Sequence, residues 1–156
     1  MIKTSKILSL ITVVFLLFNC SNDDDSTDSS NTKFSPELLD GTWRISFFSD
    51  ENTQRTQEFN SYEFTFDYGE ETVWVKSNGS TEMGLLRVFQ SVINGSEYWI
   101  VEVDFSNTVN PGNADLQDLN EEWIVKNVLN AADKIEFEER FSNNTPELLH
   151  LERLLN

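Results

Sequence analysis

The sequence predicts an all-β domain: an eight-stranded antiparallel up-and-down meander that closes into a barrel. From Gly41 onward apolar and polar residues alternate, with turn signals at short intervals, and this pattern is typical of a barrel or sandwich. Asn-Gly pairs at 78–79 and 94–95 lie between alternating runs. Such a pair favours a two-residue hairpin turn, because both central residues take a positive φ.

The elements follow from this alternation, beginning with a short helical turn over 36–39. We expect the eight strands at 42–49, 58–67, 71–77, 80–93, 96–105, 121–128, 133–141 and 147–154. A second helical turn is expected over 114–119, inside a long loop at 106–120. This loop is rich in oxygen-bearing side chains, which leaves open whether it covers the barrel mouth or binds calcium.

Two-residue turns at the Asn-Gly pairs also predict which residues face each other across the strands. The expected pairs are Val73–Gly84, Trp74–Met83, Leu86–Val103, Arg87–Glu102, Val88–Val101 and Gln90–Trp99. Gly84 would let the sheet bend, as closure of a barrel requires. We assign to the interior Val73, Val75, Leu86, Val88, Trp99, Val101, Val103 and Phe105, together with the rows Trp43-Ile45-Phe47, Tyr62-Phe64-Phe66, Trp123-Val125, Ile135-Phe137 and Leu149-Leu151.

The outer face of the same strands is unusually apolar. It carries Trp74, Met83, Leu85 and Phe89, and a large apolar patch on a protein surface usually marks a contact with a partner. The alternative is that another segment covers this face, either Phe34 to Leu39 or the 106–120 loop. We therefore predict a candidate partner patch here and leave its exposure open.

The N-terminus resembles a bacterial lipoprotein signal. Residues 1–19 combine two lysines with an apolar run too short to span a bilayer as a helix. The run ends in Leu17-Phe18-Asn19-Cys20, which is similar to a lipobox, although Phe18 and Asn19 are bulkier than usual. Three aspartates follow within five residues and resemble the surface-export signal of Bacteroidetes outer-membrane lipoproteins. The resemblance implies that Cys20 is lipidated and holds the protein at the outer membrane, exposed at the cell surface.

The chain is strongly acidic, with 27 acidic and 11 basic residues and a net charge of −16. Such a charge argues against binding to nucleic acid or to anionic headgroups. Residues 20–33 contain the lipidation site and a polar, self-repelling stretch, which predicts a flexible tether. We therefore expect a signal at 1–19, the tether at 20–33 and one folded domain at 34–156.

The opening of the domain resembles the lipocalin superfamily. Gly41-Thr42-Trp43 matches the Gly-X-Trp motif that begins the first strand in that family. In lipocalins this Trp closes the barrel floor and a basic residue of the last strand stacks on it, a role that the resemblance assigns to Arg153. We expect two departures from the family: no C-terminal helix after the last strand, and no disulfide of the usual kind, because the sequence has a single cysteine.

The residues offer little catalytic chemistry. His150 is the single histidine and is expected to point outward from its strand. Adjacent acidic pairs such as Glu138-Glu139 cannot converge on one substrate atom, since neighbouring strand residues point to opposite faces. We expect no enzyme activity, no cofactor and no metal.

The sequence leaves two candidate functions. The first is a lipid-anchored binding protein that holds a small apolar or amphipathic ligand in the barrel, lined by Tyr62, Phe64, Gln90 and Trp99. The alternative is an interaction module with a solid barrel, which docks on an unknown partner protein through the outer patch.

Overall fold

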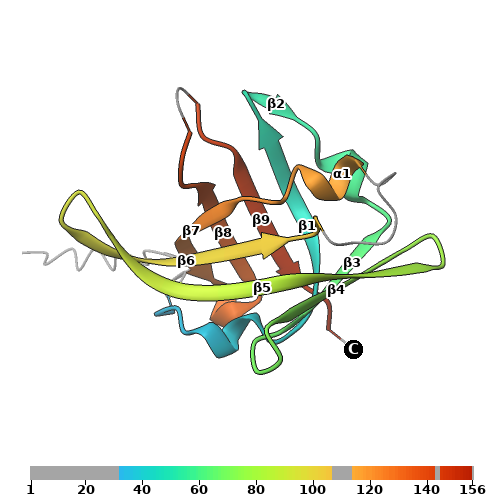
Figure 1. Ribbon diagram of the computed structural model, residues 1–156, viewed down its shortest axis with the longest axis horizontal. Coiled ribbons are helices and arrows are strands. Elements are labelled where there is room, and N and C mark those ends of the chain that lie inside the picture. The colour runs from blue at the N-terminus through green and yellow to red at the C-terminus, as the bar shows by residue number, and fades with distance from the viewer. Residues whose placement is uncertain (1–31, 107–113, 143–144, 156) are drawn as a thin grey trace, which may run out of the picture.

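The computed structural model describes residues 32–106, 114–142 and 145–155, so the predicted signal, Cys20 and most of the tether lie outside the described residues. The fold is an all-β, eight-stranded, closed antiparallel barrel of the lipocalin-like kind (Figure 1). The strands are β1 (Gly41–Asp50), β2 (Thr53–Gln54), β3 (Tyr62–Asp67), β4 (Thr72–Ser77), β5 (Ser80–Ile93), β6 (Ser96–Asp104), β7 (Glu122–Leu129), β8 (Lys134–Glu139) and β9 (Leu148–Arg153). Short helical turns are η1 (Pro36–Leu39), η2 (Thr56–Phe59), α1 (Ala114–Gln117) and η3 (Asn130–Ala132).

The strands pair in chain order, and β1 pairs with β9 to close the barrel. The additional strand β2 forms only a short hairpin with the end of β1. The predicted strand at 58–67 begins later than expected, at Tyr62, because residues 56–59 form the turn η2. This turn places Phe59 in the core. In Figure 1 the long strand β5 crosses the front of the barrel and extends beyond it on one side.

Both Asn-Gly turns have the predicted geometry. Asn78 and Gly79 have φ values of 48° and 82°, and Asn94 and Gly95 have 50° and 83°. The six predicted cross-strand pairs are all present. One of them, Arg87 with Glu102, is an ion pair at 2.7 Å. The register predicted from the two turns is therefore confirmed over β4, β5 and β6.

Gly84 makes room for an aromatic side chain inside the barrel. A Cβ atom at this position would lie 2.6 Å from the ring of Phe105 and 2.9 Å from the carbonyl oxygen of Asp104. Phe105 is fully buried. The glycine thus lets the ring of Phe105 lie directly against the backbone of β5, where any larger residue would displace it.

Two bulges change which residues face the interior. The pairing of β1 with β9 shifts between Ile45 and Phe47, so that Phe48 is fully buried while Phe47 lies partly exposed. The prediction that Phe47 faces inward is therefore wrong, because a bulge adds one residue and inverts the alternation after it. A similar shift between Val125 and Asn127 in β7 brings Val128 into the core.

Trp43 closes one end of the barrel, and among its contacts the stacking of Arg153 is the one that the resemblance implies. Its indole N–H donates to the carbonyl of Leu39 at 2.7 Å, and the guanidinium of Arg153 lies 4.2 Å from the ring centroid. Arg153 also donates to the carbonyls of Asp40 and Leu38 at 2.7 and 2.6 Å. Gly41 has a φ of 123°, and a Cβ atom there would meet the Arg153 guanidinium at 2.6 Å. The Gly-X-Trp motif therefore requires a glycine at its first position.

Candidate functional site on the outer face of a filled barrel

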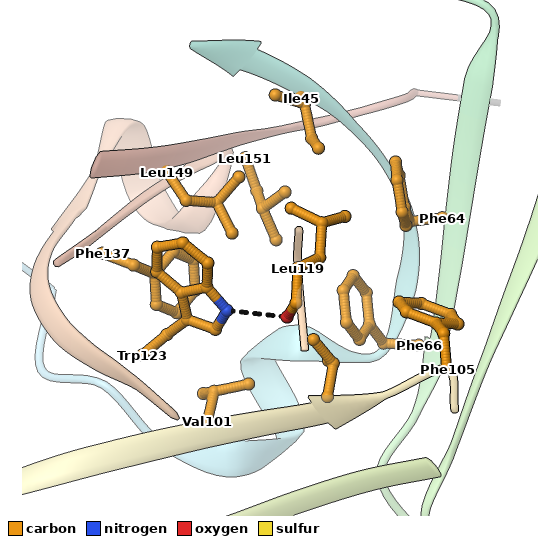
Figure 2. Close-up of a pocket in the computed structure, with 11 residues that line it drawn as sticks. Ile45, Phe64, Phe66, Val101, Phe105, Leu119, Trp123, Phe137, Leu149 and Leu151 are labelled. Atoms are coloured by element: carbon orange, nitrogen blue, oxygen red, sulfur yellow. Dashed lines mark hydrogen bonds between the residues drawn. The ribbon is translucent and has the colours of Figure 1, made fainter. Parts of the chain in front are cut away.

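The barrel interior is filled by its own side chains. The cavity between them has a volume of about 20 Å³ and a wholly apolar lining, which is room for roughly one water molecule. Ligand pockets usually measure about 300 to 1,000 Å³. Figure 2 shows the labelled lining side chains converging from around the barrel, with Leu119 reaching in from the loop. The full lining is Ile45, Phe64, Phe66, Val101, Val103, Phe105, Leu119, Trp123, Phe137, Leu149 and Leu151.

The described part of the 106–120 loop covers the mouth at the other end of the barrel. Leu116 and Leu119 are buried in the core, and the indole N–H of Trp123 donates to the carbonyl of Leu119 at 3.2 Å (Figure 2). Arg55 ties the loop down by pairing with Asp118 at 2.6 Å. We call residues 114–120 the lid. The first half of the predicted calcium-binding stretch lies outside the described residues.

Arg55 is the centre of this attachment. Besides Asp118 it pairs with Asp50 at 3.0 Å and with Glu58 at 2.7 Å. The hydrogen bonds that Arg55 donates to Glu58 and Asp118 raise its pKa above the ordinary value. A single guanidinium thus joins the end of β1, the turn η2 and the lid.

The four residues predicted to line a ligand pocket lie in two separate places. Tyr62 and Phe64 are buried core residues whose rings stack at 6.2 Å, and the Tyr62 hydroxyl donates to Asp115 of the lid at 3.2 Å. Trp99 is half-buried and packs on Phe34 at 5.8 Å. Gln90, its cross-strand partner, is exposed. The four side chains therefore share no cavity among the described residues.

Three large apolar side chains remain exposed on the outer face. Trp74, Met83 and Leu85 are 46%, 45% and 48% exposed. Trp74 and Met83 are direct cross-strand neighbours, and Leu85 follows Met83 on the same face of β5. Of the two segments that were candidates to cover them, Phe34 and Leu39 of the first belong to the barrel core, and so do Leu116 and Leu119 in the described part of the second. We call Trp74, Met83 and Leu85 the outer patch.

Phe89, the fourth predicted member, stands apart from the outer patch. It is half-buried on the same face of β5, and Arg87 lies between it and Leu85 with its guanidinium 5.6 Å from the Phe89 ring. Its cross-strand partner Ile100 is fully buried and pairs in turn with Ile124. These residues form a small packed cluster on the outside of the sheet, so Phe89 contributes to the stability of β5 to β7.

Carboxylates gather at the mouth of the barrel, beside the lid. An open cleft of about 510 Å³ is lined by Asp50, Glu51, Glu139 and Glu147, with Phe141, Ser142 and Thr145. Burial raises the pKa of Glu147 to about 8, and the carboxylates of Asp50, Glu139 and Glu121 add to the effect. Burial, with Glu139 and Glu122 nearby, also raises the pKa of Glu121. Within the described ranges no group of three or more potential ligands is placed to hold a metal ion.

His150 lies on the outside of the barrel, as predicted. Its ring packs on Phe47 at a centroid distance of 4.8 Å, and its Nδ1 is 3.9 Å from a carboxylate oxygen of Glu136. Burial lowers the pKa of His150, which favours the neutral ring. The side chain therefore has a structural explanation in its packing between β1 and β8.

The packing of the lid into the barrel mouth was not predicted from the sequence, although the sequence contains a signal for it. Leu119 and Trp123 close the mouth with the same hydrogen bond, four residues apart, that Leu39 and Trp43 make at the other end. Both segments read Leu-X-X-X-Trp, with the tryptophan among the first residues of a strand. A comparison of the two would have predicted that the lid packs into the barrel.

Comparisons with known proteins give little further information. No family model matches the chain, and no solved structure matches it. The chain is 25% identical over 147 residues to Dipeptidyl peptidase 4 of Sus scrofa, a similarity that covers 89% of this chain but 18% of that protein. The chain thus spans less than a fifth of the length of this relative. In the parts of the chain that the structure describes, no helix has the length and hydrophobicity to cross a membrane.

Proposed function

We propose that this protein is a non-catalytic interaction module of the bacterial cell envelope, anchored through a lipid on Cys20. Its closed barrel would present the outer patch of Trp74, Met83 and Leu85 to a partner protein. One observation carries this proposal: about half of each of these three side chains is exposed, while the barrel interior is packed.

The filled interior favours this function over transport of a small ligand. A cavity of about 20 Å³ is more than tenfold below the usual size of a ligand pocket. Both ends of the barrel are also closed, by Trp43 at one end and by the lid and Trp123 at the other. A ligand of the predicted kind would therefore have to displace core side chains before it could enter.

The composition of the outer patch supports a protein partner. Tryptophan is among the residues that contribute most to binding energy at protein interfaces, and methionine is also enriched there. A standard interface buries about 800 Å² on each partner, which is more than three side chains provide. The outer patch would thus form the centre of a larger contact, with the surrounding polar residues as its rim.

The anchoring part of the proposal rests on the sequence. The apolar run, Cys20 and the acidic tether together resemble a surface lipoprotein of the Bacteroidetes kind. The absence of catalysis is proposed because His150 and the adjacent acidic pairs give no convergent set of reacting groups.

Photo-crosslinking in cells that produce the protein tests this function. A photoreactive phenylalanine analogue at Met83 should give a defined adduct with one partner, and a second substitution, Trp74→Ala, should remove most of it. The matched control places the analogue at Lys126, an exposed residue of β7, where little adduct should form. Equal adducts at positions 83 and 126, or a Met83 adduct that is insensitive to Trp74→Ala, would refute docking through the outer patch.

A further inference from the structure

The outer patch lies beside a row of residues with a carboxylate at each end. The row runs across four strands, from Asp67 through Thr72 and Leu85 to Asp104, each directly opposite the next. Neighbouring strands are about 4.8 Å apart, so the two carboxylates stand roughly 14 Å from each other across the sheet. Leu85 of the outer patch lies between them.

Neither of the two carboxylates is compensated by a basic side chain of the described residues. The basic side chains nearby are already paired, Lys76 with Glu63 at 4.0 Å and Arg87 with Glu102 at 2.7 Å. In contrast, neither Asp67 nor Asp104 has a basic partner among the described residues. Each accepts a hydrogen bond from a backbone N–H, Asp67 from Glu70 and Asp104 from Ser106.

Asp104 is held in its charged form. Hydrogen bonds from Ser106 lower the pKa of its carboxyl group, so its negative charge is present at neutral pH and below. A partner that covers the outer patch also removes water from this carboxylate. If the partner places uncharged or acidic groups there, the charge stays unpaired and the binding free energy becomes less favourable.

We propose that the partner is a protein surface with apolar side chains at its centre and Lys or Arg side chains on two sides, spaced to meet Asp67 and Asp104. This inference rests on the proposed function and specifies the chemistry of the partner. A second copy of the chain fits poorly, because face-to-face pairing would bring these carboxylates together in a protein of net charge −16. An anionic lipid surface is excluded by the same repulsion.

Synthetic peptides provide a direct probe of this chemistry. One amphipathic helical peptide carries leucines on one face with lysines on both flanks, and a matched peptide has glutamates in place of the lysines. Binding to the full chain in zwitterionic lipid nanodiscs is measured by fluorescence anisotropy, with empty nanodiscs as a blank. The lysine peptide should bind at least tenfold more tightly than the glutamate peptide, and Trp74→Ala should weaken it by tenfold or more.

Charge variants separate this contact from general attraction to an acidic protein. The double variant Asp67→Asn/Asp104→Asn should weaken binding of the lysine peptide by about fivefold to tenfold, because two surface ion pairs contribute about 1 kcal/mol or slightly more in total. The control Glu51→Gln/Glu97→Gln removes the same charge from two exposed positions elsewhere and should change binding less than twofold. Equal losses in the two double variants would overturn the inference, as would equal binding of the two peptides.

The same charge variants distinguish failure of this inference from failure of the proposed function. If the Met83 photo-adduct in cells depends on Trp74 but keeps its yield in Asp67→Asn/Asp104→Asn, the outer patch docks a partner whose charge is not basic. The inference then fails and the function stands. If the adduct is insensitive to Trp74→Ala, the proposed function fails first. A decrease of the adduct in both variants supports the two together.

Discussion

The protonation of Glu147 depends strongly on the fold. Its ordinary pKa of 4.5 rises to about 8 among the carboxylates at the barrel mouth. Between these two values the folded protein retains a proton that the unfolded chain releases. A group that binds more protons in the folded state makes stability fall as pH rises, so Glu147 stabilises the folded barrel fully only below about pH 4.5.

We therefore predict a declining stability between pH 5 and pH 8 that depends on Glu147. Glu147→Gln should make the free energy of unfolding less dependent on pH in this window and should stabilise the protein at pH 8, because glutamine stays uncharged. Urea unfolding at several pH values measures both effects. Glu51→Gln, an exposed residue of the same cleft, controls for the loss of one charge. An equal change of slope in that variant would contradict the role of Glu147.

Arg153 is the second residue with a large expected effect. Its contact with Trp43 contributes roughly 1–2 kcal/mol, and its two hydrogen bonds to backbone carbonyls add to this. Arg153→Met should destabilise the barrel by about 3 kcal/mol in urea unfolding. Arg44→Met removes an exposed pair with Glu152 and should cost less than about 1 kcal/mol. If the two variants lost similar free energies of unfolding, the contact of Arg153 with Trp43 would contribute no more than an exposed ion pair.

At the scale of elements, the ion pair of Arg55 with Asp118 adds to the apolar packing of Leu116 and Leu119 that holds the lid to the barrel. Arg55→Met should release Asp118 and loosen residues 114–120, while the core strands remain folded. Hydrogen exchange by NMR would show this as faster exchange of the Trp123 indole N–H, which donates to Leu119. The Trp43 indole N–H, at the opposite end, serves as an internal reference. Unchanged exchange at Trp123 would mean that apolar packing alone holds the lid.

The elements also show where prediction from sequence succeeds and where it fails. The hairpins β4–β5 and β5–β6 were predicted residue by residue, because a two-residue Asn-Gly turn determines the register of both strands. The bulge after Ile45 has no comparable signal, so Phe47 was placed inside although Phe48 takes that position. A bulge depends on how β1 meets β9, which are far apart in the sequence.

The candidate site was predictable only in part, for a similar reason. Alternation alone places Trp74, Met83 and Leu85 on the outer face, and all three lie there. Whether another segment covers them, and whether the interior holds a cavity, depends on packing between distant residues. The filling of the mouth by Phe59 and Leu119 comes from turns and loops, where the period-two pattern gives no information.

For the whole molecule, the described structure is a packed barrel with its distinctive chemistry on the outside. Its interior is lined by apolar side chains around a cavity of about 20 Å³. Its outer patch of three exposed apolar side chains lies beside the carboxylates of Asp67 and Asp104, which have no basic partner among the described residues. We propose that the protein acts through this surface and carries no cargo.

Native mass spectrometry of the protein purified from its own cells tests this claim most directly. We expect a mass equal to that of the lipidated chain, with no stoichiometric small molecule that is lost on denaturation. The same spectrum is recorded for Trp74→Ala, which leaves the interior unchanged. A stoichiometric small-molecule adduct present in both the wild-type protein and Trp74→Ala would place a ligand inside the barrel and refute the proposed function.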